Sequence, residues 1–274
     1  MPEGPEVKRM VDQMRPHILG RQIKSISLLS GRYTKKDPEK FSIFAPLLHS
    51  SSVVIRQVSC KGKFIYFEIE NNESNSWSIW NTLGMTGGWS NTKFSDSRVM
   101  LEFDEFDLFF NDSRNFGTIK FCDNPAELAK KLSSLGMDPL AKDIPDTYVT
   151  SRLRNFGRKT MAEVLMNQAF LAGVGNYIKA EALYLSRISP HRMAGSLTQA
   201  ESELLNKSIM SIIRSSYDSG GSTIKSYKDF NGNSGNFSSR FLVYGNKKDP
   251  LGNDVIREET KDKRTTHWVP SVQK

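Results

Sequence analysis

The sequence is poor in residues that bind metals or form disulfides. Its two cysteines, Cys60 and Cys122, lie far apart, which predicts neither a disulfide framework nor a cysteine-rich zinc site. The four histidines are scattered and do not supply the missing ligands. No apolar run approaches the roughly 20 residues that a membrane span needs, and the N-terminus is too acidic for a secretory signal. We therefore expect an intracellular protein that contacts no membrane and holds no metal.

The net charge of +8 is unevenly distributed along the chain. Acidic residues outnumber basic ones between residues 95 and 149, whereas basic residues predominate between 150 and 192. Such segregation predicts a positive face of the kind that binds a polyanion such as DNA or RNA. A solvated lysine-rich face explains the composition about equally well. The basic residues of the second segment are Arg152, Arg154, Arg158, Lys159, Lys179, Arg187 and Arg192.

The length suggests about two domains, and the character of the sequence changes near residue 125. Before this point, short segments rich in β-branched and aromatic residues predict strands, including a hairpin over residues 99–110. After it, caps and apolar periodicity predict helices. RFLVYG (240–245) and HWV (267–269) are strand-like and predict a final hairpin. We predict an α+β protein with a two-layer β-sandwich flanked by helices (1–127), a connecting helix and linker (128–149), a helical domain (150–238) and a hairpin (239–274).

The opening stretch MPEGPEV contains two residues that a helix start does not explain. Pro5 and Glu6 suit the first turn of a helix, whereas Pro2 and Glu3 precede it. We expect Met1 to be removed because residue 2 is small, which would leave Pro2 with a free secondary amine. An α-amino group has a pKa of about 7.7–8.0 and is far less protonated at neutral pH than lysine. Such an amine can form an iminium with a carbon that bears a leaving group, and a neighbouring carboxylate can move protons.

The same stretch resembles the start of the formamidopyrimidine-DNA glycosylase and endonuclease VIII family of bifunctional repair enzymes. The resemblance implies that Pro2 is the nucleophile, Glu3 the general acid and base, and Glu6 a supporting carboxylate. CKGKFIYFEI resembles the family's lysine-bearing loop, so Lys63 is implied to contact DNA phosphate or the lesion. TLGMTG and NDSRNFG resemble the segments that fill the gap left by an extruded nucleotide. This implies a wedge formed by Met85, Arg114 and Phe116.

The second half carries two further motifs of that family. LAGVGNYIKAEAL resembles the helix–two-turn–helix signature, and Asn176 matches its phosphate-binding asparagine. FLVYGNKKDPLGNDV and RTTHWVPSVQ resemble the zinc finger, whose phosphate-gripping arginine matches Arg264. The four zinc cysteines are absent, as in the zincless finger of some endonuclease VIII-like proteins, where apolar packing replaces the metal. Their places are taken by Leu251, Asp254, Val269 and Val272.

The resemblance covers essentially the whole chain and implies a DNA glycosylase with AP-lyase activity. It would act in base excision repair as a monomer on double-stranded DNA that contains oxidised bases or abasic sites. Pro2 would attack C1′ of the damaged nucleotide, and the resulting iminium would permit β- and δ-elimination without an external cofactor.

Two alternatives to the preferred substrate and function stay open. The missing zinc ligands favour the endonuclease VIII-like branch, whose usual targets are oxidised pyrimidines and hydantoins. GGSTIKSYKDF (220–230) instead resembles the loop that the formamidopyrimidine branch places over an oxidised purine, which favours 8-oxoguanine. Outside the enzyme class, the chain could be a damaged-DNA-binding protein without catalysis. Such a protein would have no physical need for an intact set of Pro2, Glu3 and Lys63.

Overall fold

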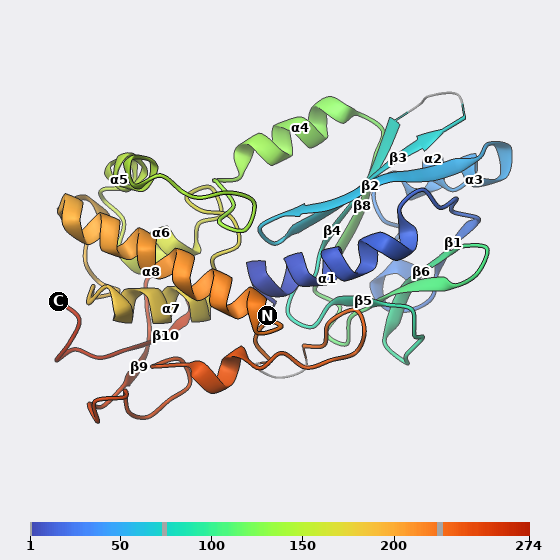
Figure 1. The fold of residues 1–274 in the computed structure, drawn as a ribbon. Coiled ribbons are helices and arrows are strands. Elements are labelled where there is room, and N and C mark those ends of the chain that lie inside the picture. Colours follow the sequence, from blue (N-terminus) through green and yellow to red (C-terminus); the bar gives the residue numbers. More distant parts are fainter. Residues whose placement is uncertain (1, 73–75, 224–226) are drawn as a thin grey trace.

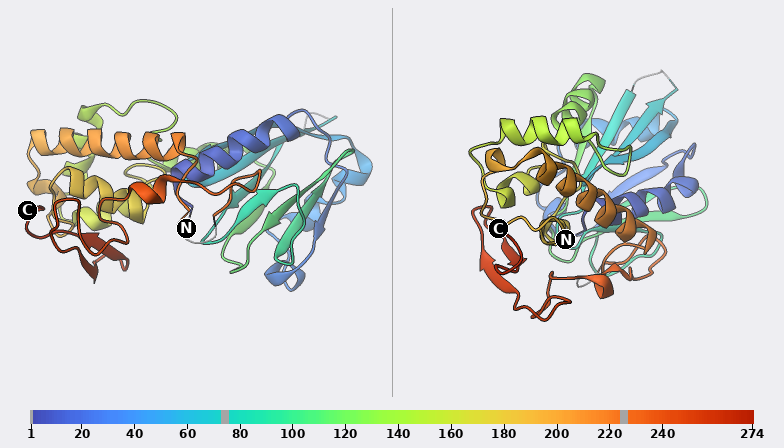
Figure 2. Two further views of the ribbon diagram at one scale, coloured as in Figure 1. Left: turned by 60° about the horizontal axis from the view of Figure 1, so that its bottom comes forward. Right: turned by 60° about the vertical axis from the view of Figure 1, so that its left-hand side comes forward.

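The computed structural model describes residues 2–72, 76–223 and 227–274, which form two lobes (Figure 1). The first lobe contains most of the strands, and the second contains the long helix α8 (Gln199–Asp218) and the C-terminal hairpin. The first helix, α1 (Gly4–Ile18), lies along the sheets with its start at the junction of the lobes (Figure 2). The beginning of the chain is therefore held between the two lobes.

The first lobe is built from two four-stranded antiparallel sheets, in the orders β2-β3-β4-β8 and β1-β6-β7-β5. Rings from both sheets meet in the shared core, where Trp89 contacts Phe67 and Phe110. This arrangement confirms the predicted two-layer β-sandwich and the hairpin, in which Val99 pairs with Phe110. The strands are β1 (Ser25–Leu28), β2 (Val53–Lys61), β3 (Phe64–Asn71), β4 (Ser76–Thr82), β5 (Gly88–Ser90), β6 (Ser97–Glu102), β7 (Asp107–Asn111) and β8 (Thr118–Cys122).

Short helical segments cover the ends and edges of this lobe. They are the 3₁₀ turn η1 (Gly31–Thr34) and the helices α2 (Phe41–Phe44), α3 (Leu47–Ser50) and α4 (Pro125–Ser134). The last of these begins at Pro125, because Asn124 caps its first turn and Pro125 needs no hydrogen-bond partner there.

The second lobe is organised around α7 (Asn176–Leu185), most of whose side chains are buried. Threonine–glutamate capping boxes start two of the helices that surround it, at Thr160 and Thr198. No helix in the described part of the chain is both long and apolar enough to cross a membrane. The other helical elements of the lobe are α5 (Asp146–Asn155), α6 (Met161–Met166), η2 (Ala194–Ser196) and η3 (Phe237–Arg240).

The C-terminal hairpin uses only one of the two predicted strands. It pairs β9 (Ile256–Glu259) with β10 (Thr265–Trp268), so the prediction that RFLVYG pairs with HWV is wrong. The physical reason is the buried carboxylate of Glu181 on α7. It accepts hydrogen bonds from the backbone N–H groups of Leu242, Val243 and Tyr244 at 2.8, 3.0 and 2.7 Å, which leaves these donors unavailable to a partner strand.

Candidate active site at the lobe junction

Three glycines bring distant backbone segments into contact where the lobes meet. They are Gly4 at the start of α1, Gly62 in the β2–β3 turn and Gly173 before α7. A Cβ atom on Gly62 would lie 2.3 Å from the nitrogen of Gly173, and one on Gly4 would lie 3.0 Å from its Cα. The N–H group of Gly4 donates to the carbonyl of Gly173 at 2.9 Å. The absence of three side chains thus lets the N-terminus, the Lys63 turn and the start of α7 meet.

Glu3 is buried at the N-terminus of α7. Its carboxylate accepts hydrogen bonds from the N–H groups of Tyr177 and Ile178 at 2.9 and 3.3 Å. A Cβ atom on Gly175 would lie 2.2 Å from Glu3 Cδ, so this glycine makes room for the carboxylate. Burial raises the pKa of Glu3 to about 7, against the opposing effects of the Lys63 charge and the two N–H donors. The group can therefore exchange a proton near neutral pH.

Lys63 reaches the same point from the β2–β3 turn. Its Nζ donates to the carbonyl of Val174 at 2.7 Å. Burial lowers the pKa of Lys63, while the negative charges of Glu3 and Glu6 favour its protonated form. The structure thus brings the half-buried Lys63 amine and two buried carboxylates together.

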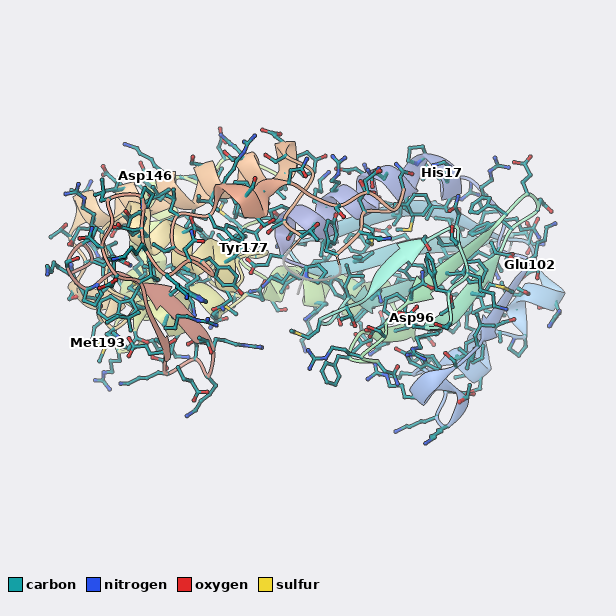
Figure 3. All side chains as sticks on the ribbon, turned by 90° about the horizontal axis from the view of Figure 1, so that it is seen from below. His17, Asp96, Glu102, Asp146, Tyr177 and Met193 are labelled. Atoms are coloured by element: carbon teal, nitrogen blue, oxygen red, sulfur yellow. The ribbon has the colours of Figure 1, made fainter. Side chains whose placement is uncertain are left out.

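The buried carboxylate of Glu6 accepts hydrogen bonds from the N-terminal segment, α7, α8 and the loop that follows α8. It accepts hydrogen bonds from the N–H groups of Glu3 and Ser222, both at 2.7 Å, and from the hydroxyls of Tyr177 and Ser216, at 3.1 and 3.3 Å. Burial raises its pKa despite these donors. Figure 3 labels Tyr177 where the helical lobe approaches the sandwich. Sequence reasoning missed Tyr177 and Ser216, because nothing local marks residues that meet Glu6 only in the fold.

Pro2 is buried and borders two cavities. One has a volume of about 460 Å³ and is also lined by Met85, Arg114 and residues 227–232. The other, of about 260 Å³, is also lined by Lys63 and Gly84. The residue predicted to be the nucleophile therefore has space on both sides for parts of a substrate.

The three predicted wedge residues come from two loops that are joined by hydrogen bonds. Met85 lies half-buried in the β4–β5 turn, whereas Arg114 and Phe116 are exposed between β7 and β8. The N–H group of Arg114 donates to the hydroxyl of Thr86 at 3.0 Å. The guanidinium carbon of Arg114 lies 4.8 Å from the centre of the Phe116 ring, a cation–π arrangement that stiffens both side chains. Phe116 is 55% exposed, so its ring is accessible to a partner surface.

The predicted phosphate ligands of the second lobe lie beside each other. Asn176, at the start of α7, donates through Nδ2 to the carbonyl of Thr265 at 2.9 Å. Arg264 is exposed in the turn before β10, and its charge adds to the effect of burial in lowering the pKa values of both Lys63 and Lys179. The finger hairpin is thus placed next to the turn that carries Asn176 and close to the buried group around Glu3.

Two cations that the sequence assigned to a positive face are paired with carboxylates of other segments. Lys179 is buried in a salt bridge with Asp262, with 2.6 Å between Nζ and Oδ2. Arg192 pairs with Glu201 at 2.6 Å. The composition of the segment therefore overstates its exposed charge, because a charged residue in a sequence does not reveal an acidic partner from another segment.

We expect Asp262→Asn to destabilise the finger strongly, because Lys179 would keep its buried charge without a counter-ion. The expected loss in the free energy of unfolding is about 3–5 kcal/mol, measured by urea denaturation. The double variant Lys179→Met/Asp262→Leu should recover most of this loss, since it removes both charges. An equal loss in the single and double variants would contradict the explanation.

Family models for formamidopyrimidine-DNA glycosylases match almost the entire chain. The N-terminal domain model matches residues 1–119, the H2TH domain model 135–228 and the C-terminal domain model 228–274. The chain is 30% identical to formamidopyrimidine-DNA glycosylase of Cytobacillus firmus over 283 residues, which cover 100% of both proteins. The chain belongs to the formamidopyrimidine-DNA glycosylase family. A relative from Brevibacillus brevis is 31% identical over 100% of this chain and 99% of its own.

Solved structures of the formamidopyrimidine-DNA glycosylase family share the fold. The MutM (Fpg) protein of Thermus thermophilus superposes with a TM-score of 0.85 at 28% identity, covering 99% of this chain and 98% of its own. A Lactococcus lactis Fpg variant in complex with DNA containing Fapy-dG superposes with a TM-score of 0.86 at 25% identity over 100% of both chains. These relatives are named as formamidopyrimidine-DNA glycosylases, so placement in the endonuclease VIII-like branch stays a prediction.

The zinc that a finger of this family implies does not fit the residues present. Leu251 is 77% exposed, and Asp254 is engaged with Lys248 at 2.9 Å. Val269 is buried and Val272 packs beside it in a small apolar cluster. Within the described residues, no three His, Cys, Asp or Glu side chains lie together as a metal site would require.

Direct contacts, most of them to α7, attach the finger to the second lobe and take over the role of a metal ion. The hydroxyl of Tyr184 donates to Asp249 at 3.0 Å, and Glu181 and Lys179 bind the tail as described above. Gln273 accepts from the N–H group of Val269 at 2.7 Å and donates to a carbonyl of the helical lobe at 2.9 Å. The finger is therefore a packed extension of the second lobe.

Proposed function

We propose that the protein is a bifunctional DNA glycosylase and AP lyase whose nucleophile is the amine of Pro2. The observation that supports this most strongly is the position of Pro2. It borders two cavities and directly precedes Glu3, a buried carboxyl group with a pKa of about 7. Displacement of a poor leaving group requires a nucleophile and a proton donor side by side. A carboxyl group with a pKa of about 7 is about half protonated at neutral pH and can therefore donate that proton.

The proposed reaction begins when the Pro2 nitrogen forms a bond to C1′ of an extruded nucleotide. The bond from C1′ to the base breaks, and the departing base takes the electron pair and a proton from Glu3. The N–H proton of Pro2 then passes to the Glu3 carboxylate and on to O4′ as the C1′–O4′ bond breaks, which opens the sugar ring and leaves an iminium between C1′ and Pro2. Loss of a C2′ proton then expels the 3′ phosphate, and a second elimination expels the 5′ phosphate. In both eliminations the electron pair of the broken C–H bond passes towards the iminium, so the scheme needs no cofactor.

We assign DNA contacts to both lobes. Asn176, Arg264 and Lys63 lie near the Pro2 site and carry donors suited to phosphate oxygens. Met85, Arg114 and Phe116 form an apolar and cationic group beside the same cavity. Such a wedge offsets part of the unstacking cost, about a few kcal/mol, of extruding a nucleotide.

We expect Arg264→Ala to weaken binding of an abasic-site duplex while leaving the fold intact, since Arg264 is exposed. The slope of log K against log salt should become shallower by about one, as expected when one phosphate contact is lost. Titrations between low and moderate salt measure this slope. Arg56→Ala, which removes an exposed cation from β2 in the other lobe, serves as the matched control. An unchanged slope in Arg264→Ala would remove this residue from the interface.

For the substrate, we propose formamidopyrimidines and 8-oxoguanine as first candidates. Lactococcus lactis Fpg has been solved with Fapy-dG DNA and with abasic DNA, and a MutM with carbocyclic 8-oxo-G DNA. Oxidised pyrimidines and hydantoins are the second candidates, favoured by the missing zinc ligands. The loop GGSTIKSYKDF bears on this choice, but residues 224–226 lie outside the described part of the chain. Its anchors are described: Ser222 binds Glu6, and the Tyr227 hydroxyl donates to the Glu6 carbonyl at 3.3 Å.

Borohydride trapping tests this proposal. Duplexes with an abasic site, formamidopyrimidine, 8-oxoguanine, thymine glycol, dihydrouracil or a hydantoin are incubated with the protein and reduced. We expect a covalent adduct that peptide mapping places on Pro2, and the rates across the panel rank the substrates. DNA binding without any adduct, even on the abasic duplex, would instead support a damaged-DNA-binding protein without catalysis.

A further inference from the structure

The larger cavity beside Pro2 lies between two turns. Its volume of about 460 Å³ falls within the range of roughly 300–1,000 Å³ that is typical of small-molecule pockets. Pro2 lines one part, residues 227–232 form one side, and residues 85–96 form the opposite side. Because Pro2 lines this cavity, the cavity offers room for a base whose sugar lies at Pro2.

The first side is fixed by Asp229. Its carboxylate accepts hydrogen bonds from the N–H groups of Asn231 and Asn233 at 3.1 and 2.9 Å, which closes a tight turn. It also accepts from Gln13 at 2.8 Å and from Arg9 at 3.3 Å, both on α1. The hydrogen bonds of Asp229 therefore fix this side of the cavity against α1.

The opposite side is fixed by Ser97. Its hydroxyl accepts from the N–H group of Phe94 at 2.9 Å and donates to Asn111 at 2.5 Å. The carbonyl of Asp96 accepts from the N–H group of Asp112 at 3.0 Å. Asp96 is labelled on the sandwich in Figure 3 and marks where this loop lies. The backbone that carries Phe94 is thus held by the neighbouring strands.

Phe94 differs from the other aromatic residues that line this cavity in the described chain. Trp89, Tyr227 and Phe230 are 1%, 9% and 3% exposed, because their rings belong to the core of the sandwich. Phe94 is 49% exposed although its backbone is fixed. Its ring therefore offers an apolar face to the cavity, where a planar group can cover it.

We propose that Phe94 is the platform on which the extruded base stacks while its sugar lies at Pro2. An extruded base loses its stacking partners in the duplex, and an aromatic ring on a fixed loop replaces one of them. The ligand class is a planar nucleobase, damaged or ring-opened. This inference rests on the proposed function, since it places the sugar at Pro2.

The test compares base removal with cleavage of a preformed abasic site, which has no base to stack. Single-turnover rates are measured on duplexes with formamidopyrimidine, 8-oxoguanine, dihydrouracil or an abasic site. We expect Phe94→Ala to slow removal of the best base about tenfold or more, the loss typical of one base–aromatic contact. Cleavage of the abasic duplex should change less than about twofold. Phe94→Tyr should stay near wild type, whereas Phe94→Leu should resemble Phe94→Ala because it lacks a π-face.

Ile43→Ala is the matched control, because Ile43 is 57% exposed on α2 and does not line this cavity. Equal losses on the base and abasic duplexes would overturn the proposal and show a structural role for Phe94. Unchanged base removal in Phe94→Ala, or full activity in Phe94→Leu, would overturn it as well. Wild-type protein that cleaves abasic sites but removes no base also overturns it. Wild-type protein that cannot be trapped on the abasic duplex would instead refute the proposed function itself.

Discussion

Replacing Glu3 with glutamine is expected to slow removal of a damaged base by about 10²–10⁴-fold at neutral pH, the range typical of a lost general acid or base. Glutamine keeps the shape of the side chain and can still accept hydrogen bonds at its carbonyl oxygen. It cannot give a proton to the departing base. Its amide nitrogen would also face one of the N–H donors of Tyr177 and Ile178, which now bind carboxylate oxygens. Single-turnover excision assays measure the loss.

The control for Glu3→Gln is trapping on a preformed abasic duplex. An abasic aldehyde has no base to expel, so the first step there does not need the acid form of Glu3. We expect the adduct with Pro2 to form in this variant, at a rate much closer to wild type than base removal. Equal losses on both duplexes would mean that Glu3 positions Pro2 and does not act as the acid.

The pH profile gives a second check on Glu3. Its pKa is raised to about 7, so the acid form predominates below this value and is lost as the pH rises through it. The rate of base removal should therefore fall on the alkaline side with an apparent pKa near 7. Lys63 lowers the pKa of Glu3, so Lys63→Met should move this limb to higher pH as well as weaken DNA binding. A limb that stays in place would contradict the charge coupling between the two groups.

Local sequence patterns predicted the sandwich because each strand carries its own signal. Alternating apolar residues in VMLEF and FDLFF specify one buried face each, and the structure pairs Val99 with Phe110 accordingly. RFLVYG carries a similar signal but forms no strand. Glu181, about 60 residues earlier in the chain, takes its N–H groups, and no local pattern reveals such a competitor.

The candidate site was predictable where a short motif carries the chemistry. Pro2 and Glu3 stand out because Pro5 and Glu6 already account for the sequence pattern of a helix start, although in the structure Glu3 is also the N-cap residue of α1. The role of the glycines before α7 emerges only from the structure, in which Gly173 contacts Gly4 and Gly62, and Gly175 accommodates Glu3. The contacts with Gly4 and Glu3 join segments about 170 residues apart in the chain, so the spacing of motifs in the sequence does not reveal them. Lys179 is a similar case, since only the fold shows that Asp262 neutralises it.

Replacing Pro2 with glycine is expected to reduce two activities to the limit of detection: base removal, and trapping of an abasic site through residue 2. Both residues are small, so removal of Met1 should be unaffected and the variant still ends in a free amine. Glycine gives a primary amine, whose iminium can lose its N–H proton and become a neutral imine. The iminium of a secondary amine has no such proton and keeps its positive charge until hydrolysis, which makes it the better electron sink.

The buried position of residue 2 adds to the chemical difference between proline and glycine, because it also affects how the amine is oriented. Pro2 is buried beside both cavities, and its pyrrolidine ring adds contacts that hold the amine in place, whereas a glycine terminus would sample many orientations of its amine. DNA binding should be retained, because the assigned phosphate contacts lie elsewhere on the two lobes. Mass spectrometry of both proteins verifies that Met1 is absent, and trapping with borohydride measures the amine's reactivity. A Pro2→Gly protein that is trapped on abasic DNA at the wild-type rate, through another residue, would move the nucleophile to a lysine, with Lys63 the first to test.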